Sequence, residues 1–470
     1  GYSVFTPNGV TPEQANSLTG TGMLNAQSIT EVINGYVTGD LFSIGNADPI
    51  KVVVGYEWRS EDFDRTSDTV FAEGQLLGQG GPTPSLGGGF TVTEFFAEAN
   101  IPLTENLTGD LAYRYSDYST VGGQDTYRVG LDWQPIDLAR FRTGYNRAVR
   151  APNVSELYSV NNLGLWAGTD PCSGATPEYT AAQCALTGVT AAQYGSVVQS
   201  PADQYNQVTG GNVDLDVEEA DTITVGVVLT PTDNLTVSVD YWDIEIENTI
   251  ATVGAENIVR QCATNGVLCD SITRGPTGNL WQGEIPRVFN GLQNIGTGVT
   301  SGVDVAASWM TDALGGTFNV NLAGTYLMDW EIEILPGEAY DCVGLLSSRC
   351  YPKPEWRHTM TASYDSNSFW AVTARWRYFE GVDYDGALTS TRSEGADAIA
   401  QDNMSGSESY LDLNATFRFF GDSELLVGIN NVLDEEPPLV GGSLSSNANA
   451  IAGFYDTLGQ YLFAQATFRF

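Results

Sequence analysis

Residues 370–378 read WAVTARWRY: even positions carry apolar or aromatic side chains, and odd positions from Thr373 on carry Thr373, Arg375 and Arg377. Successive side chains of a β-strand point to opposite faces of its sheet, so this period of two predicts a strand with one apolar face and one polar face. The same period recurs in residues 127–133, 235–241 and 411–419. The sequence therefore predicts an all-β protein.

Composition limits what this β protein can be. The chain has 470 residues, with 20 Lys and Arg against 58 Asp and Glu, and its net charge is −38. Nucleic acid is excluded as a partner, because its recognition needs clustered basic residues. Hydrophobic residues make up 42% of the chain, which argues against disorder. No linker divides the sequence, so we expect one large closed sheet.

The connections between the predicted strands fall into two kinds. Short turns, such as those at residues 102–106 and 231–234, alternate with long loops. Alternating strands alone also fit a soluble sandwich, but short periplasmic turns opposite long external loops are typical of outer-membrane barrels, as are aromatic residues near strand ends. We therefore expect a transmembrane barrel. Its long external loops are predicted at residues 61–90, 151–216, 248–285, 331–353, 381–407 and 434–457.

Six cysteines form three close pairs in the sequence, all within the predicted long loops. None has the C-x2-C spacing of a zinc site, and short local loops cost the least entropy to close. We expect disulfides in an oxidising compartment. The predicted pairs are Cys172–Cys184, Cys262–Cys269 and Cys342–Cys350.

No catalytic constellation is apparent, so we do not expect an enzyme. The single histidine, His358, shares the parity of Met360 and Ala362 at the start of a predicted strand, which places it facing outward near the upper aromatic girdle. No Gly-rich phosphate loop follows a strand and opens a helix. The sequence predicts neither a metal site nor a cofactor.

Several motifs occur in a distinctive order. Residues 147–158 read RAVRAPNVSELY and residues 210–215 read GGNVDL; residues 240–244 read DYWDI and residues 430–434 read NNVLD, and the chain ends in a strand with a final Phe470. This set resembles the C-terminal barrel portion of TonB-dependent outer-membrane receptors, most closely those of a Caulobacter- and sphingomonad-like proteobacterial branch. Val213 departs from the proline that the family usually carries at that point.

The resemblance implies a 22-stranded transmembrane antiparallel β-barrel of which this chain supplies about fifteen C-terminal strands. Counted back from Phe470, these are strands 8–22 in residues 31–470, and residues 1–30 are expected to be an external loop. The plug domain and the first strands would then lie in a missing segment or a second chain. A long segment at 286–311 contains Gly296, Gly298 and Gly302, which predict bulges or a division into two strands.

The resemblance implies energy-coupled import of a scarce nutrient that the external loops bind. The expected partners are the plug with the first strands, a TonB-type complex reached through the plug, outer-membrane lipid and lipopolysaccharide, and a small-molecule, saccharide or peptide ligand. The alternative is a surface receptor that binds a partner chain and does not itself transport. Haem is disfavoured because residues 152–214 contain no His, and acidic loops disfavour a strongly anionic ligand.

Two sets of site residues follow from this interpretation. Basic residues of the strands are predicted to face the lumen and the plug: Arg128, Arg140, Arg142, Arg147, Arg150, Arg375 and Arg377. Aromatic residues of the long loops are candidates for ligand contact: Tyr158, Trp166, Tyr179, Tyr194, Trp281, Tyr340, Tyr384 and Tyr455.

Overall fold

Long antiparallel strands dominate the computed structural model, which describes residues 9–76, 82–283, 285–335, 337–346, 350–384, 406–419, 423–439 and 450–469. They form one sixteen-stranded sheet, in which fifteen strands follow one another and the short β15 (Ala339–Asp341) pairs with β14. The fifteen are β1 (Leu24–Ser43), β2 (Pro49–Ser67), β3 (Leu86–Thr104), β4 (Leu107–Tyr118), β5 (Gly122–Ile136), β6 (Ala139–Arg150), β9 (Glu218–Thr232), β10 (Leu235–Ala251), β13 (Gln293–Ala313), β14 (Gly316–Glu333), β17 (Trp356–Asp365), β18 (Trp370–Phe379), β20 (Glu408–Phe419), β21 (Ser423–Asn430) and β22 (Tyr461–Thr467).

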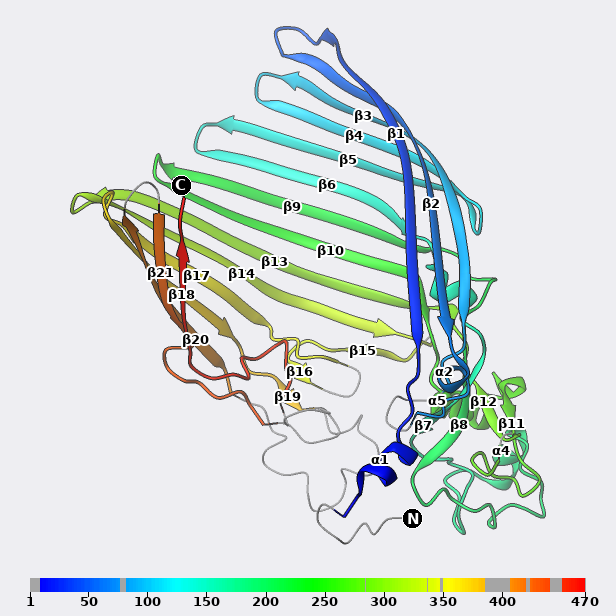
Figure 1. Ribbon diagram of the computed structural model, residues 1–470. Coiled ribbons are helices and arrows are strands. Elements are labelled where there is room, and N and C mark those ends of the chain that lie inside the picture. The colour runs from blue at the N-terminus through cyan, green and yellow to red at the C-terminus, as the bar shows by residue number, and fades with distance from the viewer. Residues whose placement is uncertain are drawn as a thin grey trace.

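Each strand of this sheet pairs with the strand before it and the strand after it, so the chain makes a simple antiparallel meander (Figure 1). The strands lie side by side in a tilted, curved sheet, and we call this sixteen-stranded sheet the wall. Among the described residues, β1 pairs only with β2 and β22 only with β21. The predicted all-β class and the predicted count of about fifteen strands are confirmed.

Several strand boundaries differ from those predicted. The first strand begins at Leu24, and residues 24–30, which were expected in a loop, pair with residues 61–67 of β2. The predicted loop at 61–90 is correspondingly shorter, because β3 already begins at Leu86. The segment 286–311 divides into β12 (Arg287–Phe289), which joins another sheet, and β13; a register shift occurs between Ser301 and Gly302.

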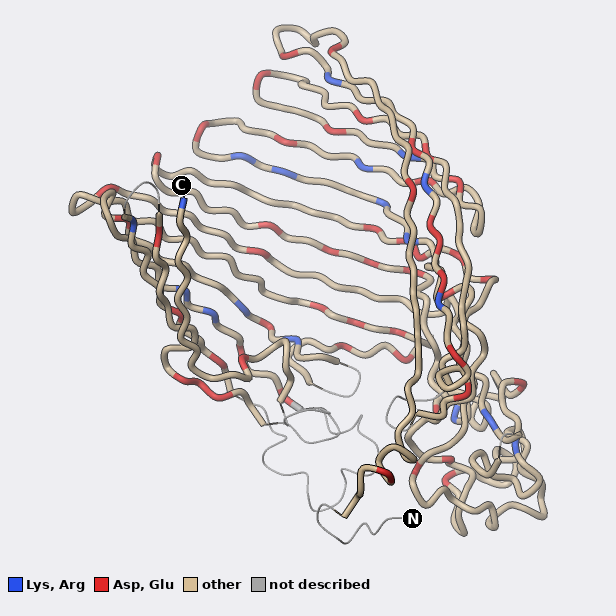
Figure 2. The backbone as a smooth tube through the Cα atoms, in the orientation of Figure 1, with Lys and Arg blue, Asp and Glu red and all other residues tan. Residues whose placement is uncertain are grey.

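The two faces of the wall differ in chemistry. Large apolar side chains on one face are exposed, including Val54 (59%), Phe95 (57%) and Val129 (48%); we call this the apolar face. The opposite, polar face carries the charged residues that alternate with them, such as Arg128 beside Val129. Figure 2 shows acidic residues outnumbering basic ones along the strands. A wall with one exposed apolar face is suited to contact with lipid.

The two ends of the wall also differ. One end has short turns, and the other carries longer connections that hold most of the small elements; in Figure 1, α4, α5, β7, β8, β11 and β12 lie at the lower right, and β15, β16 and β19 lie nearer the lower centre. These elements are α2 (Thr69–Ala72), α3 (Val154–Tyr158), β7 (Asn162–Ala167), α4 (Ala181–Leu186), β8 (Gln204–Thr209), α5 (Ala255–Asn265), η1 (Cys269–Ser271), β11 (Ile272–Thr273), β12, β15, β16 (Leu345–Leu346) and β19 (Asp383–Tyr384), while α1 (Pro12–Leu18) precedes β1. Helices α4 and α5 both lie within long connections between strands of the large sheet.

No helix in the described ranges has the length and apolar character needed to cross a membrane.

Candidate functional site: the stapled loop unit and the polar face

The connections 151–217 and 252–292, of which residue 284 lies outside the described residues, fold together at the long-loop end. We call them the stapled loop unit. Strands β11, β12, β8 and β7 form a four-stranded sheet in it. Helix α5 packs on this sheet through Ile258 and Val259, and its chain reverses at Gly266, which adopts a left-handed φ of 69°. The unit thus has its own hydrophobic core, unlike the wall.

Three disulfides cross-link the long connections at this end of the sheet. Two lie in the stapled loop unit, Cys172–Cys184 and Cys262–Cys269, and a third, Cys342–Cys350, lies between β15 and β17. All three predicted pairings are confirmed. Cys172 and Cys184 pack with Val189 and Val197 in a small separate core. Cross-linked loops lose less conformational entropy on folding, so this end can hold a defined shape.

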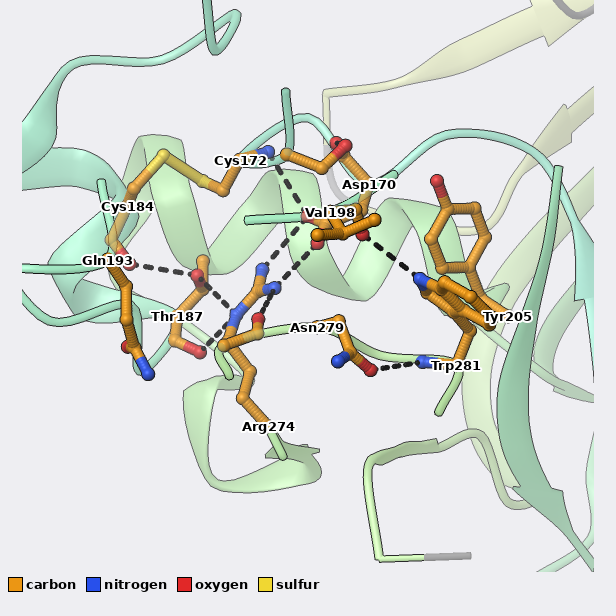
Figure 3. A network of polar contacts seen from close by, with 12 residues as sticks. Asp170, Cys172, Cys184, Thr187, Gln193, Val198, Tyr205, Arg274, Asn279 and Trp281 are labelled. Atoms are coloured by element: carbon orange, nitrogen blue, oxygen red, sulfur yellow. Dashed lines mark hydrogen bonds and ion pairs between the residues drawn. A yellow bond between two sulfur atoms is a disulfide. The ribbon is translucent and has the colours of Figure 1, made fainter. Parts of the chain in front are cut away.

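A buried ion pair joins the two connections of the unit (Figure 3). Arg274 donates to Asp170 through both terminal nitrogens, at 2.6 and 2.9 Å, and the two side chains are 3% and 0% exposed. The guanidinium also donates to the carbonyl oxygens of Thr187, through Nε, and Gly278, through Nη1. Because its donors meet acceptors from several segments, Arg274 fixes how the two connections sit against each other.

The predicted ligand-contact aromatics take different places. Trp166 is 7% exposed and stacks on Tyr205 with ring centroids 4.8 Å apart, and Tyr455 is 4% exposed in another core. Burial raises the pKa of the Tyr455 phenol. These two residues stabilise the loops, and their burial does not agree with predicted ligand contact.

Five of the other aromatic candidates are half-buried: Tyr158, Tyr179, Tyr194, Trp281 and Tyr340. Trp281 donates from its indole to the carbonyl of Val198, and Tyr158 packs over Gly88, where a Cβ would lie 2.3 Å from its ring. The Tyr194 hydroxyl donates to the Tyr179 carbonyl at 2.9 Å. The Tyr340 side chain lies beside a small hollow near α5, and that of Tyr384 lies outside the described residues. Ligand contact stays a prediction for these half-buried side chains.

The RAVRAPNVSELY segment forms the base of the stapled loop unit. Arg150 forms ion pairs with Glu218 in β9 and with Glu156 in α3, at 2.6 and 3.0 Å. Asn153 and Glu156 cap α3 reciprocally through their side chains. The Gly211 amide donates to the carbonyl of Ser159, at a point where any Cβ would meet backbone atoms. The two motifs of this region therefore hold the loop ends together.

Most of the arginines predicted to face the plug are neutralised within the wall. On the polar face, Arg140 pairs with Asp132 and Arg142 with Asp240, each at 2.6 Å. Arg375 and Arg377 share Asp412, at 2.8 and 3.2 Å. Alternating acidic and basic side chains on neighbouring strands therefore satisfy one another. Of the predicted arginines, only Arg128 forms no ion pair with the described residues.

Arg147 departs from the prediction in a different way. It lies two residues after Tyr145, on the apolar face, opposite Tyr127 and Asp221 in the neighbouring strands. Its Nε donates to Asp221, which also accepts from the Tyr145 hydroxyl at 2.7 Å. The assignment of Arg147 to the plug-facing side is wrong because its parity is that of Tyr145, not of Arg150.

His358 lies among aromatic side chains at the long-loop end of the apolar face, as its parity predicted. The Trp356 indole donates to its Nδ1 at 2.9 Å, and its ring stacks on that of Tyr378 at 5.2 Å. This environment is that of a structural girdle residue. Throughout the part of the chain that the structure describes, no group of three or more His, Cys, Asp or Glu side chains is placed to hold a metal ion.

A wall of long antiparallel strands with an exposed apolar face, an ion-paired polar face and disulfide-closed loops at one end defines an outer-membrane β-barrel protein. The sequence profile described as "TonB dependent receptor-like, beta-barrel" matches residues 2–432. The chain belongs to this family. TonB-dependent receptors are outer-membrane transporters rather than enzymes. Among curated proteins, none matches the sequence.

Solved structures of similar fold include siderophore receptors. The ferric enterobactin receptor of Pseudomonas aeruginosa aligns with a TM-score of 0.62 at 15% identity, covering 93% of this chain and 54% of that one. The siderophore receptor PirA from Acinetobacter baumannii gives 0.59 at 16% identity, with the same two coverages of 93% and 54%. The ferripyoverdine receptor of Pseudomonas aeruginosa gives 0.53 at 14%, covering 90% and 47%. The chain spans about half the length of these receptors, and identities this low show the fold alone.

Proposed function

We propose that this protein takes part in energy-coupled import of a scarce nutrient across the outer membrane, with the stapled loop unit facing outside. The observation that carries the proposal is the stapled loop unit itself, which is folded and cross-linked at one end of a wall with a polar face. A binding surface ordered before the ligand arrives avoids the entropic cost of ordering it during binding. The half-buried Tyr158, Tyr179, Tyr194, Trp281 and Tyr340 are the proposed contacts for a small-molecule, saccharide or peptide ligand.

Import in this form requires partners that complete the wall. Among the described residues, no strand pairs with the outer edges of β1 and β22, and each backbone N–H or C=O group left unpaired in lipid costs several kcal/mol. We infer that further strands pair with both edges, from another segment or a second chain, and that a plug occupies the polar interior. Arg128 is the proposed plug contact on the wall, because the other predicted arginines of the polar face already have carboxylate partners.

The test begins with purification from the native outer membrane and mass spectrometry of the small molecules and polypeptides that co-purify. The identified molecule, radiolabelled, is then supplied to cells with and without an uncoupler of the proton gradient. We expect uptake that depends on this protein and stops with the uncoupler, while uptake of a small porin substrate continues as the control. Uptake through this protein that continues at the same rate in the presence of the uncoupler would contradict the proposal.

A surface receptor within a complex is the second candidate. Every residue of β1 is exposed, from Leu24 to Ser43, so a partner polypeptide has a long strand edge to pair with. Co-purification of a second polypeptide at fixed ratio, together with no uptake of any co-purified small molecule, would favour this candidate over import.

A further inference from the structure

Strand β7 forms one edge of the four-stranded sheet in the stapled loop unit (Figure 1). It pairs with β8 on one side, and no strand among the described residues pairs with its other side. The edge of such a strand presents a row of backbone N–H and C=O groups to whatever lies beside it. An extended chain can therefore add one more strand to this sheet at β7.

The backbone hydrogen bonds of β8 show which groups of β7 point to the free side. The amide of Asn206 and the carbonyl oxygen of Val208 both bond to segments outside β7. Leu165 lies opposite Asn206, and Leu163 lies opposite Val208. Opposite residues of an antiparallel pair bond either to each other or both outward. The N–H and C=O groups of Leu163 and Leu165 therefore point to the free side of β7.

Most of these edge groups are available for binding. The Leu165 carbonyl oxygen accepts a hydrogen bond from the side chain of Gln207 at 3.0 Å. Within the described part of the chain, the Leu163 carbonyl oxygen and the N–H groups of both leucines have no hydrogen-bond partner. An added strand would supply the missing acceptors and donor with its own backbone.

The side chains at this edge are apolar on one face of the small sheet. Leu163 lies opposite Val208, which pairs in turn with Phe289 of β12, so the three share a face. Leu165 lies on the same face, and Leu165 and Phe289 are 57% and 42% exposed. The other face of the sheet packs against α5. A peptide beside β7 would continue the exposed apolar face, because side chains of neighbouring strands stand side by side.

The charge of this connection favours a basic occupant. Residues 151–217 contain no Lys or Arg, and their acidic residues are Glu156, Asp170, Glu178, Asp203, Asp214 and Asp216. Asp203 directly precedes Gln204, which lies opposite Ala167 at the end of β7. It forms no ion pair with the described residues. Complementary charge on a ligand increases its rate of association with such a surface.

We propose that β7 binds an extended cationic peptide by strand addition, which makes a peptide the ligand of the loop unit and, for its transport, rests on the proposed import function. Backbone hydrogen bonds to Leu163 and Leu165 supply affinity, and apolar side chains at every second position of the peptide pack beside the two leucines. The intervening basic side chains point to the opposite face. A saccharide has no backbone that repeats donors and acceptors at the spacing of a strand.

The first test uses protein purified from the native outer membrane and a fluorescent five-residue peptide of alternating lysine and valine, with lysine at both ends. Peptide residues on the apolar face also point their N–H groups at β7, so methylation of both valine nitrogens removes those donors. Methylation of the second and third lysine nitrogens leaves the donors in place and is the matched control. Fluorescence anisotropy should show about tenfold weaker binding for the valine-methylated peptide, the effect of two lost backbone hydrogen bonds. The control should bind like the unmethylated peptide.

The second test changes the edge of the protein. Leu165→Pro removes an N–H group that points to the free side, a position at which an edge strand tolerates proline. Val213→Pro places the same ring elsewhere in the loop unit, where the side chain is 64% exposed, and is the control. We expect Leu165→Pro to weaken binding of the unmethylated peptide about tenfold and Val213→Pro to leave it unchanged. Hydrogen exchange of β8 shows whether each variant keeps the small sheet folded.

Three outcomes would overturn strand addition: no binding of the unmethylated peptide, equal binding of the valine-methylated form, or full binding to Leu165→Pro while β8 stays protected. Uptake of the fluorescent peptide and of the co-purified nutrient is measured separately, with and without the uncoupler. Methylation-sensitive binding without energy-dependent uptake of either molecule would leave the peptide site standing and remove import. Energy-dependent uptake of the nutrient without peptide binding would do the reverse.

Discussion

The stapled loop unit and the wall use apolar side chains in opposite ways. In the loop unit, Ile258 is 1% exposed and Leu280 is fully buried, as in the core of a water-soluble domain. In the wall, Phe95 and Val129 are 57% and 48% exposed, although they belong to long, regular strands. Burial among protein atoms stabilises the first region, and backbone hydrogen bonds with lipid outside stabilise the second. The solvent that each surface meets explains the difference.

The two regions also differ in how deeply their ion pairs are buried. The Arg274–Asp170 pair of the loop unit is almost fully buried, while Arg140 and Asp132 in the wall are 55% and 26% exposed. Solvent screens the wall pair, so it contributes little to stability. In the loop pair, removing either partner would leave the other charge buried and uncompensated.

Removing one member of each pair tests that contrast and should give the largest effect. Asp170→Ala leaves the Arg274 guanidinium buried without its partner, so we expect the loop unit to lose about 3–5 kcal/mol. Asp132→Ala in the wall should change stability by about 0–1 kcal/mol. Hydrogen exchange of residues 160–210 and of β5 measures the two losses separately.

A third variant tests whether the loss of stability comes from the unpaired buried charge. Asp170→Leu combined with Arg274→Met removes both charges and should recover much of the lost protection, since an apolar pair of similar volume can replace a buried ion pair. Similar losses from Asp170→Ala and Asp132→Ala would show that the two regions do not differ in this respect.

Two valines with the same exposure sharpen the comparison. Val129 in β5 and Val267 after α5 are both 48% exposed. Val129→Arg places a charge on the apolar face, and we expect a loss of about 2–4 kcal/mol if lipid lies there. Val267→Arg should stay within about 0.5 kcal/mol, because water surrounds the loop. Urea unfolding in phospholipid vesicles measures both, and equal effects would mean that the apolar face is not in lipid.

Sequence patterns predicted the wall well and the loop unit poorly. The period of two depends only on neighbours along one strand, so stretches such as 370–378 carry their own evidence. The local disulfide Cys172–Cys184 was also within reach, because it spans twelve residues. The partners Arg274 and Asp170 are 104 residues apart, and nothing in either segment marks them as a pair. Contacts of that kind are set by how two loops pack.

Two predictions from the sequence failed for separate physical reasons, one concerning the face of a strand and the other concerning burial in a loop. Arg147 and Arg150 stand in one motif, but three residues along a strand reverse the face, which places Arg147 beside Tyr145. Trp166 belongs to a loop by sequence, yet strands β7 and β8 give that loop an interior, and its ring stacks on Tyr205 there. A loop long enough to fold on itself cannot be assumed to expose its aromatic residues.

The smallest expected effect concerns pH and the core of the loop unit. Burial raises the pKa of Tyr205 above its ordinary value of 10.0. In the unfolded loop the phenol loses its proton near that value, whereas the buried phenol keeps it. The stabilising contribution is therefore fully present below pH 10 and is lost as the pH rises through the higher folded pKa. Cleavage within the loop unit by an alkaline protease should rise severalfold between pH 9 and 11. Tyr205→Phe, which cannot ionise, should flatten that rise; an unchanged pH response would show that ionisation of another group weakens the loop unit at alkaline pH.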